Sequence, residues 1–178
     1  IFGQGAIRGH PFVLKEIEAT REPDPATALR DFDAAFFGHL AFTLSNVARV
    51  LWMGISGARL TPVPGAPELR HYYQQLTRLS GAFALTADTA MFLCGGTLKR
   101  RERLSARLGD VLSQLYLASA VLKRFEDDGR PGEDLPLVRW GLLDSLYRIE
   151  ESFYSIFENL PWPAVAWVAT SWTGSPSR

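Results

Sequence analysis

Glu68 and His71 have the spacing that most resembles a metal-binding motif in this chain. Ferritin-like di-metal bundles place two ligands on one helix face with this Glu-x-x-His spacing, and they require two copies together with further glutamates. The sequence holds one copy, because neither His10 nor His39 follows a glutamate by three residues. We therefore predict a solvated helix start here and no metal site.

The basic segment Lys99–Arg103 is the second candidate, this time for an anion. Its cations stand at the start of an expected helix, where free backbone amides also attract phosphate. The alternative is pairing within the chain, which we favour because surface ion networks are common. The available acids are Asp88, Glu102, Asp127, Asp128 and Glu133. These acids also cancel the positive charge that a nucleic-acid site in this segment would need.

The remaining candidates have weaker support. Gly3 and Gly5 form a Gly-x-Gly pair, but the further glycine of a phosphate loop and a preceding strand are missing from the pattern. Ser105 and Ser113 have no local histidine or lysine to activate them. His39 is interpreted as a satisfied, partly buried histidine. The aromatic residues that we interpret as packing are Tyr72, Tyr73, Tyr116, Trp140 and Tyr147. No catalytic residue is predicted, and the cofactor-binding residues remain unknown.

These side chains must be positioned by helices, of which residues 98–130 give the clearest pattern. Apolar residues recur there at alternating steps of four and three, which places them on one helix face. They are Leu104, Leu108, Val111, Leu115, Ala118, Leu122 and Phe125. Gly129 is expected to end this helix, and Arg107 to pair with Asp110.

Similar stripes predict three further long helices. One begins at Asp24-Pro25 and carries Leu29, Phe32, Phe36, Leu40, Thr43, Val47 and Leu51, which we expect to be buried. Another begins near Pro67 and carries Leu69, Tyr72, Leu76, Leu79, Phe83, Ala87, Ala90 and Cys94. The last begins at Asp134 and carries Leu135, Val138, Leu142, Leu146, Ile149, Phe153, Ile156 and Leu160. We predict an all-α fold of about five helices, three of them long amphipathic helices packed as a bundle.

The composition limits the possible partners. Lys plus Arg equals Asp plus Glu at 19 each, so no overall field favours nucleic acid or an anionic membrane. The single cysteine, Cys94, excludes an internal disulfide and is expected in the core. No stretch contains the roughly 20 consecutive apolar residues of a membrane span, so none is predicted. Asp88 lies among apolar residues, and we expect it to pair with the cations of 99–107.

Two long segments carry a resemblance to a known family. Residues 98–130, LKRRERLSARLGDVLSQLYLASAVLKRFEDDGR, followed by DLPLVRW at 134–140, resemble the C-terminal region of bacterial acyl-CoA dehydrogenases of the FadE type. IFGQGAIRGHPFVLKEIEA at 1–19 resembles the same family in the same order. The resemblance covers roughly Ile1 to Leu160. It implies the end of the dehydrogenase helical bundle at 1–20, an accessory α-helical domain at 24–160, and an irregular tail at 161–178.

The resemblance implies a fragment of a flavin-dependent enzyme of fatty-acid β-oxidation. Such enzymes oxidise acyl-CoA to trans-2-enoyl-CoA, use FAD, and pass electrons to an acceptor. Their catalytic glutamate and most flavin-binding residues would precede Ile1, so this segment alone would be inactive and structural or regulatory. We expect a cytoplasmic protein, with homo-oligomerisation and inner-membrane association through other parts left open. The alternative is a free-standing helical interaction module that binds an acidic partner or a coenzyme A phosphate through Lys99–Arg103.

Overall fold

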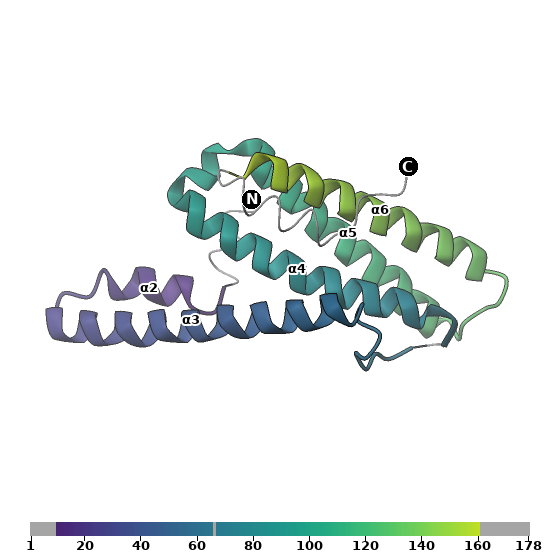
Figure 1. Ribbon diagram of the computed structural model, residues 1–178, viewed down its shortest axis with the longest axis horizontal. Helices are drawn as coiled ribbons and strands as arrows, with labels where there is room; N and C mark the ends of the chain where they lie inside the picture. The colour runs from purple at the N-terminus through teal and green to yellow at the C-terminus, as the bar shows by residue number, and fades with distance from the viewer. Residues whose placement is uncertain (1–9, 66, 161–178) are drawn as a thin grey trace.

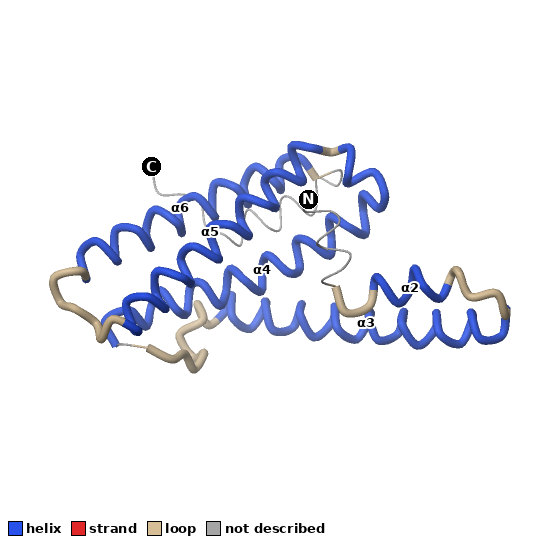
Figure 2. Tube along the Cα trace, turned by 180° about the vertical axis from the view of Figure 1, so that it is seen from behind, coloured by secondary structure: helices blue, strands red, loops and turns tan. Residues whose placement is uncertain are grey.

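The computed structural model describes residues 10–65 and 67–160, and all regular structure within these ranges is helical (Figures 1 and 2). The α-helices are α2 (Val13–Ala19), α3 (Pro25–Ile55), α4 (Arg70–Cys94), α5 (Glu102–Asp127) and α6 (Leu135–Asn159). Two short 3₁₀ helices, η1 (Pro67–Leu69) and η2 (Gly95–Arg100), precede α4 and α5. The predicted all-α fold is confirmed. Gly3 and Gly5 lie outside the described residues, as does the tail.

Helices α4, α5 and α6 form the bundle that holds the main core (Figure 1). All seven residues of the predicted α5 stripe are buried. The α4 and α6 stripes are also confirmed, since each of their members is buried or packs against this core, apart from Ala87, which is buried outside it. Cys94 is 6% exposed and belongs to the core, as expected. Burial of these apolar faces is the main source of stability for such a bundle.

The helix ends follow from local sequence. Asp24 caps α3, because its Oδ2 accepts hydrogen bonds from the Thr27 amide at 3.0 Å and from the Thr27 hydroxyl at 2.6 Å. At the end of α5, Gly129 has φ +79°, and the Gly129 and Arg130 amides donate to the carbonyls of Glu126 and Phe125. This pair of hydrogen bonds is a Schellman motif, so Gly129 ends the helix as predicted.

Helix α3 differs from the prediction, because its stripe of large apolar residues is mostly exposed. Leu29 is 64% exposed, and Phe36 is 48% exposed. The side of α3 that is buried carries Ala35, Asn46, Val50 and Met53 instead. It packs against α2 and α4, and Val50, Met53 and Ala58 form a small second cluster with Leu85. The expectation that the Leu29–Leu51 stripe is buried was therefore wrong.

Helices α2 and α3 form a hairpin that extends beyond one end of the bundle (Figures 1 and 2). The missing side chain of Gly81 in α4 permits close packing with α3, because a β-carbon there would lie 2.9 Å from the Met53 Cε. The hairpin is therefore fixed to the bundle mainly through the second half of α3.

Two helical segments are long and apolar enough to cross a membrane, contrary to our reading of the sequence. They are Pro25–Ile55 and Pro67–Leu98, each with a mean hydropathy of 1.2. Core helices of soluble proteins meet the same criterion, and much of α4 lies in the bundle core. The finding is weak evidence for a span, and the absence of one remains a prediction.

Candidate functional site

Four titratable side chains meet where the hairpin touches the bundle. His10 lies in the turn before α2, Glu16 in α2, His39 in α3 and Asp88 in α4. The side chains of His10 and Asp88 are 6% and 10% exposed. We call these four residues the histidine cluster.

Hydrogen bonds orient both imidazoles of the histidine cluster. His10 Nδ1 accepts the amide hydrogens of Phe12 at 3.2 Å and Val13 at 3.1 Å, so the imidazole caps the start of α2. A nitrogen that accepts hydrogen bonds carries no proton, so the proton of neutral His10 must reside on Nε2. His39 Nδ1 lies 2.8 Å from Glu16 Oε1, which joins α3 to α2.

His10 Nε2 points toward α4 and lies 3.3 Å from Asp88 Oδ1. This contact is not aligned as a hydrogen bond, and neither Nε2 nor Asp88 Oδ2 has a hydrogen-bond partner among the described residues. Aromatic rings close the site, with the Phe42 ring 5.7 Å and the His39 ring 4.5 Å from the His10 ring. His10 and Asp88 are thus a buried, incompletely satisfied polar pair within the cluster.

Burial shifts the pKa values of both His10 and Asp88. It lowers the pKa of His10 below its ordinary value because the imidazolium loses hydration, an effect that Asp88 and Glu16 partly offset. Burial raises the pKa of Asp88 because the carboxylate also loses hydration, with His10 acting in the opposite direction. Both shifts favour the neutral forms of these two groups.

The distances alone would allow the histidine cluster to hold a metal ion, since one ligand atom from each of His10, His39 and Asp88 lies within 4.8 Å of the others. The tautomer of His10 does not fit this role. A neutral histidine that binds a metal through Nε2 carries its proton on Nδ1, and that proton would face the two amide donors at the start of α2. Metal binding would therefore require the cap of α2 to be broken.

Most residues singled out from the sequence lie outside the histidine cluster; the exceptions are His39 and Asp88. Glu68 and His71 are both exposed, as expected for a solvated helix start. His39 is partly buried and partnered, also as expected. Asp88 pairs with His10 and not with the cations of 99–107, so that prediction was wrong. Its isolated position among apolar residues was the signal that a partner was required, but sequence spacing did not identify His10.

In the basic segment, Arg100, Arg101 and Arg103 form no ion pair with any other residue that the structure describes. Asp127 pairs with Lys123, and Asp128 pairs with Arg124. For Arg100, Arg101 and Arg103 the expected pairing with acids of this chain was therefore wrong, whereas the predicted Arg107–Asp110 pair is present at 2.9 Å. The side chains of Arg100, Arg101 and Arg103 are exposed to solvent.

The aromatic residues interpreted as packing divide into two groups. Tyr72 and Tyr73 pack against the main core. Tyr116, Trp140 and Tyr147 are 73%, 66% and 54% exposed, so for them the interpretation was wrong. Ser113 donates its hydroxyl hydrogen to the Gly109 carbonyl at 2.8 Å, an ordinary helix contact that does not activate it.

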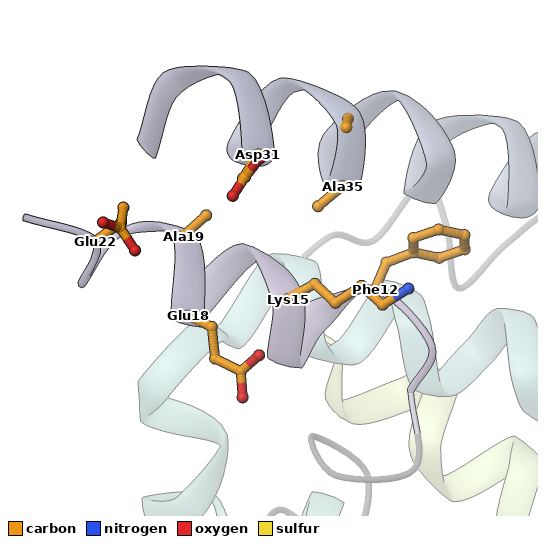
Figure 3. A pocket seen from close by; sticks show the side chains of 8 residues that line it. Phe12, Lys15, Glu18, Ala19, Glu22, Asp31 and Ala35 are labelled. Atoms are coloured by element: carbon orange, nitrogen blue, oxygen red, sulfur yellow. The ribbon is translucent and has the colours of Figure 1, made fainter. Parts of the chain in front are cut away.

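A hollow of 420 Å³ lies between α2 and α3 (Figure 3). Its lining includes Glu18, Glu22 and Asp31 against a single cation, Lys15. This excess of negative charge disfavours a nucleotide pyrophosphate. The hollow therefore does not fit the phosphates of FAD.

The described helices define the chain as an all-α bundle domain with a projecting helical hairpin. Comparison of the sequence with protein families then gives the family. Residues 7–175 match acyl-CoA dehydrogenase, C-terminal, bacterial type, and the chain belongs to this family. The resemblance to the C-terminal region of FadE-type enzymes is thereby confirmed, and the match continues past Leu160, where we expected it to end.

No solved structure matches the chain. The division at residues 20–24 stays a prediction.

Proposed function

We propose that this chain is the accessory C-terminal part of a flavin-dependent acyl-CoA dehydrogenase of fatty-acid β-oxidation, which converts acyl-CoA to trans-2-enoyl-CoA. Family membership supports the enzyme class. In this proposal the catalytic glutamate and most of the FAD-binding residues precede Ile1, and the protein is cytoplasmic. The role of the chain is to support the catalytic part by packing against it.

The observation that carries this role is the exposed apolar surface of α3. We define the α3 apolar face by residues spaced at three, four or seven along one side of the helix. They are Leu29, Phe32, Phe36, Leu40, Leu44 and Leu51. Each is at least 37% exposed. A continuous apolar surface of this kind usually marks an interaction site, and aromatic residues are typical of the centre of protein interfaces.

The charges near the α3 apolar face favour a protein partner over an anionic lipid surface. Helices that lie on membranes carry an excess of Lys and Arg beside the apolar face. Here Arg30 is followed by Asp31 and accompanied by Asp33, α2 adds Glu18, and the turn after α2 adds Glu22. Because these acids would be repelled by anionic lipid, we assign the face to the catalytic part of the parent enzyme.

The test compares this chain with a polypeptide extended upstream through the catalytic glutamate. Palmitoyl-CoA oxidation is followed with a dye acceptor, and bound flavin is read from its absorbance. We expect only the extended protein to bind flavin and to be active. Flavin binding or turnover by this chain alone would overturn the proposed location of the catalytic site.

The packing role is tested with Phe36→Gln and Leu40→Gln on the α3 apolar face. Both side chains are exposed, so the variants should leave the melting temperature of this chain nearly unchanged. In the extended protein they should lower the melting temperature and weaken flavin retention. Leu112→Gln and Tyr116→Gln, at exposed positions of α5, are the matched controls. Equal effects of both pairs on the extended protein would contradict a specific role for the α3 apolar face.

Coenzyme A binding through Lys99–Arg103 is the competing function, and it has a separate test. Calorimetric titration of this chain with coenzyme A, repeated with Arg100→Glu and Arg101→Glu, measures it directly. Binding that is lost in both variants would support the alternative. The exposed, unpaired state of Arg100 and Arg101 among the described residues is the observation that makes this titration necessary.

A further inference from the structure

Through His10 and Asp88, the histidine cluster makes a buried polar contact between the start of α2 and the bundle. The groups that face His10 are Asp88 from α4, His39 from α3 and Glu16 from α2. Three helices therefore contribute a titratable group within reach of one imidazole.

The geometry of His10 makes its protonation incompatible with its structural role. Neutral His10 leaves the Nδ1 lone pair free to accept two amide hydrogens from the start of α2. An imidazolium carries a proton on both ring nitrogens and accepts no hydrogen bond. The protonated ring would direct an N–H group at the N–H groups of Phe12 and Val13, which lie 3.2 and 3.1 Å away.

We propose that His10 is a proton-sensitive latch, which caps α2 and contacts Asp88 when neutral and releases the start of α2 when it is protonated at Nδ1. One proton is taken from solvent, and no covalent bond other than N–H forms. The latch controls how firmly α2 is held to α3 and α4. This proposal does not depend on the identity of the reaction that the parent enzyme catalyses.

The direction of the pH effect follows from burial. A histidine whose pKa is lowered by folding stabilises the folded form above its unfolded pKa, which is about 6.5. That contribution is lost as the pH falls from about 6.5 through the lower pKa of folded His10. Asp88 acts in the opposite direction. A carboxyl whose pKa is raised by folding stabilises the folded form below its unfolded pKa of about 3.9, and that stabilisation is lost as the pH rises above this value. The release of α2 in mildly acidic solution is therefore assigned to His10.

The tautomer and the release are measured separately. The chain contains three histidines, so long-range proton–nitrogen NMR spectra can resolve each ring. We expect His10 to carry its proton on Nε2 at pH 8. Hydrogen exchange of the Val13–Ala19 amides, corrected for intrinsic pH dependence, should accelerate about five- to tenfold between pH 7.5 and 5.5, as for loss of a helix cap.

Two variants and one control isolate the latch. His10→Asn places an amide oxygen near the position of Nδ1 and does not titrate, so the accelerated exchange at pH 5.5 should disappear. Asp88→Asn removes the carboxylate that favours the imidazolium, so the transition should move to lower pH. His71→Asn, which alters an exposed histidine outside the cluster, should retain the transition.

Three results would overturn the latch. The first is a proton on Nδ1 of His10 at pH 8. The second is unchanged pH dependence of α2 exchange in His10→Asn. The third is stoichiometric, micromolar binding of Zn²⁺ by the wild-type chain that is lost in His10→Asn, because that result would identify the cluster as a metal site.

Discussion

Gly38 of α3 lies so close to Phe12 that a β-carbon at position 38 would stand 2.5 Å from Cε1 of the Phe12 ring. The absence of a side chain at Gly38 thus allows the turn before α2 to pack directly on α3. Phe12 also lies beside the histidine cluster, with its ring 6.2 Å from that of His39. This contact sets the spacing of the hairpin.

The variant Gly38→Ala should loosen the hairpin. Alanine in place of glycine favours a helix by about 1 kcal/mol, but overpacking usually costs about 1–3 kcal/mol. We expect faster hydrogen exchange in α2. Gly109→Ala in α5 is the matched control, since no atom lies within 4 Å of a β-carbon there, and it should stabilise the chain by about 0.5–1 kcal/mol in urea denaturation. Slower exchange of α2 in Gly38→Ala would show that Phe12 adjusts freely.

Leu108→Ala should strongly destabilise the bundle. Leu108 is fully buried at 0% exposure, whereas Leu112, one turn later in α5, is 48% exposed. The first substitution should lower the free energy of unfolding by about 2–5 kcal/mol, because it leaves a cavity. Leu112→Ala should have an effect below about 1 kcal/mol. Similar effects of the two variants in urea denaturation would mean that the register of α5 is wrong.

Asp24 should make the start of α3 sensitive to strong acid. The hydroxyl and the amide of Thr27 hold the pKa of Asp24 below its ordinary value. A lowered carboxyl pKa contributes stability above the unfolded value, about 3.9, that is lost as the pH falls further. After correction for the intrinsic pH dependence of exchange, the Thr27 amide should therefore exchange faster at low pH. Asp24→Ala should show fast exchange at every pH, and Asp24→Asn should keep the cap without the acid response. An acid response retained in Asp24→Asn would assign it to another group.

Cys94 should report the opening of the bundle. It is the only cysteine in the sequence and is 6% exposed at the end of α4. A thiol reagent should therefore react slowly in buffer and rapidly in denaturant. Phe92 is 88% exposed two residues earlier, so Phe92→Cys combined with Cys94→Ser provides a freely reactive control. Equal rates for the two proteins in buffer would contradict the burial of Cys94.

Sequence periodicity predicted the bundle well because the apolar stripes of α4, α5 and α6 cover one another within this chain. Leu108 and Val111, for example, occupy the predicted seam and are fully buried. The cap at Asp24 and the glycine stop at Gly129 were also predictable, because both depend on neighbouring residues. These parts of the fold are determined by local pattern and mutual burial.

The same reasoning failed for α3 because periodicity identifies an apolar face without identifying what covers it. Phe36 and Leu40 are exposed, while Ala35 and Asn46 on another side are buried. The histidine cluster was missed for a related reason. His10 and Asp88 are distant in sequence, and only the packing of the hairpin on α4 brings them together.

The length of α3 has a mechanical consequence. Its 31 residues span about 46 Å at 1.5 Å per residue. The Val50–Met53–Ala58 cluster holds its second half against the bundle, and the histidine cluster holds its middle near α4. The first turns of α3, with the end of α2 beside them, project beyond the bundle (Figure 1). A slight tilt of α3 where it packs on the bundle is therefore amplified in these projecting turns, so small changes in packing give larger displacements there.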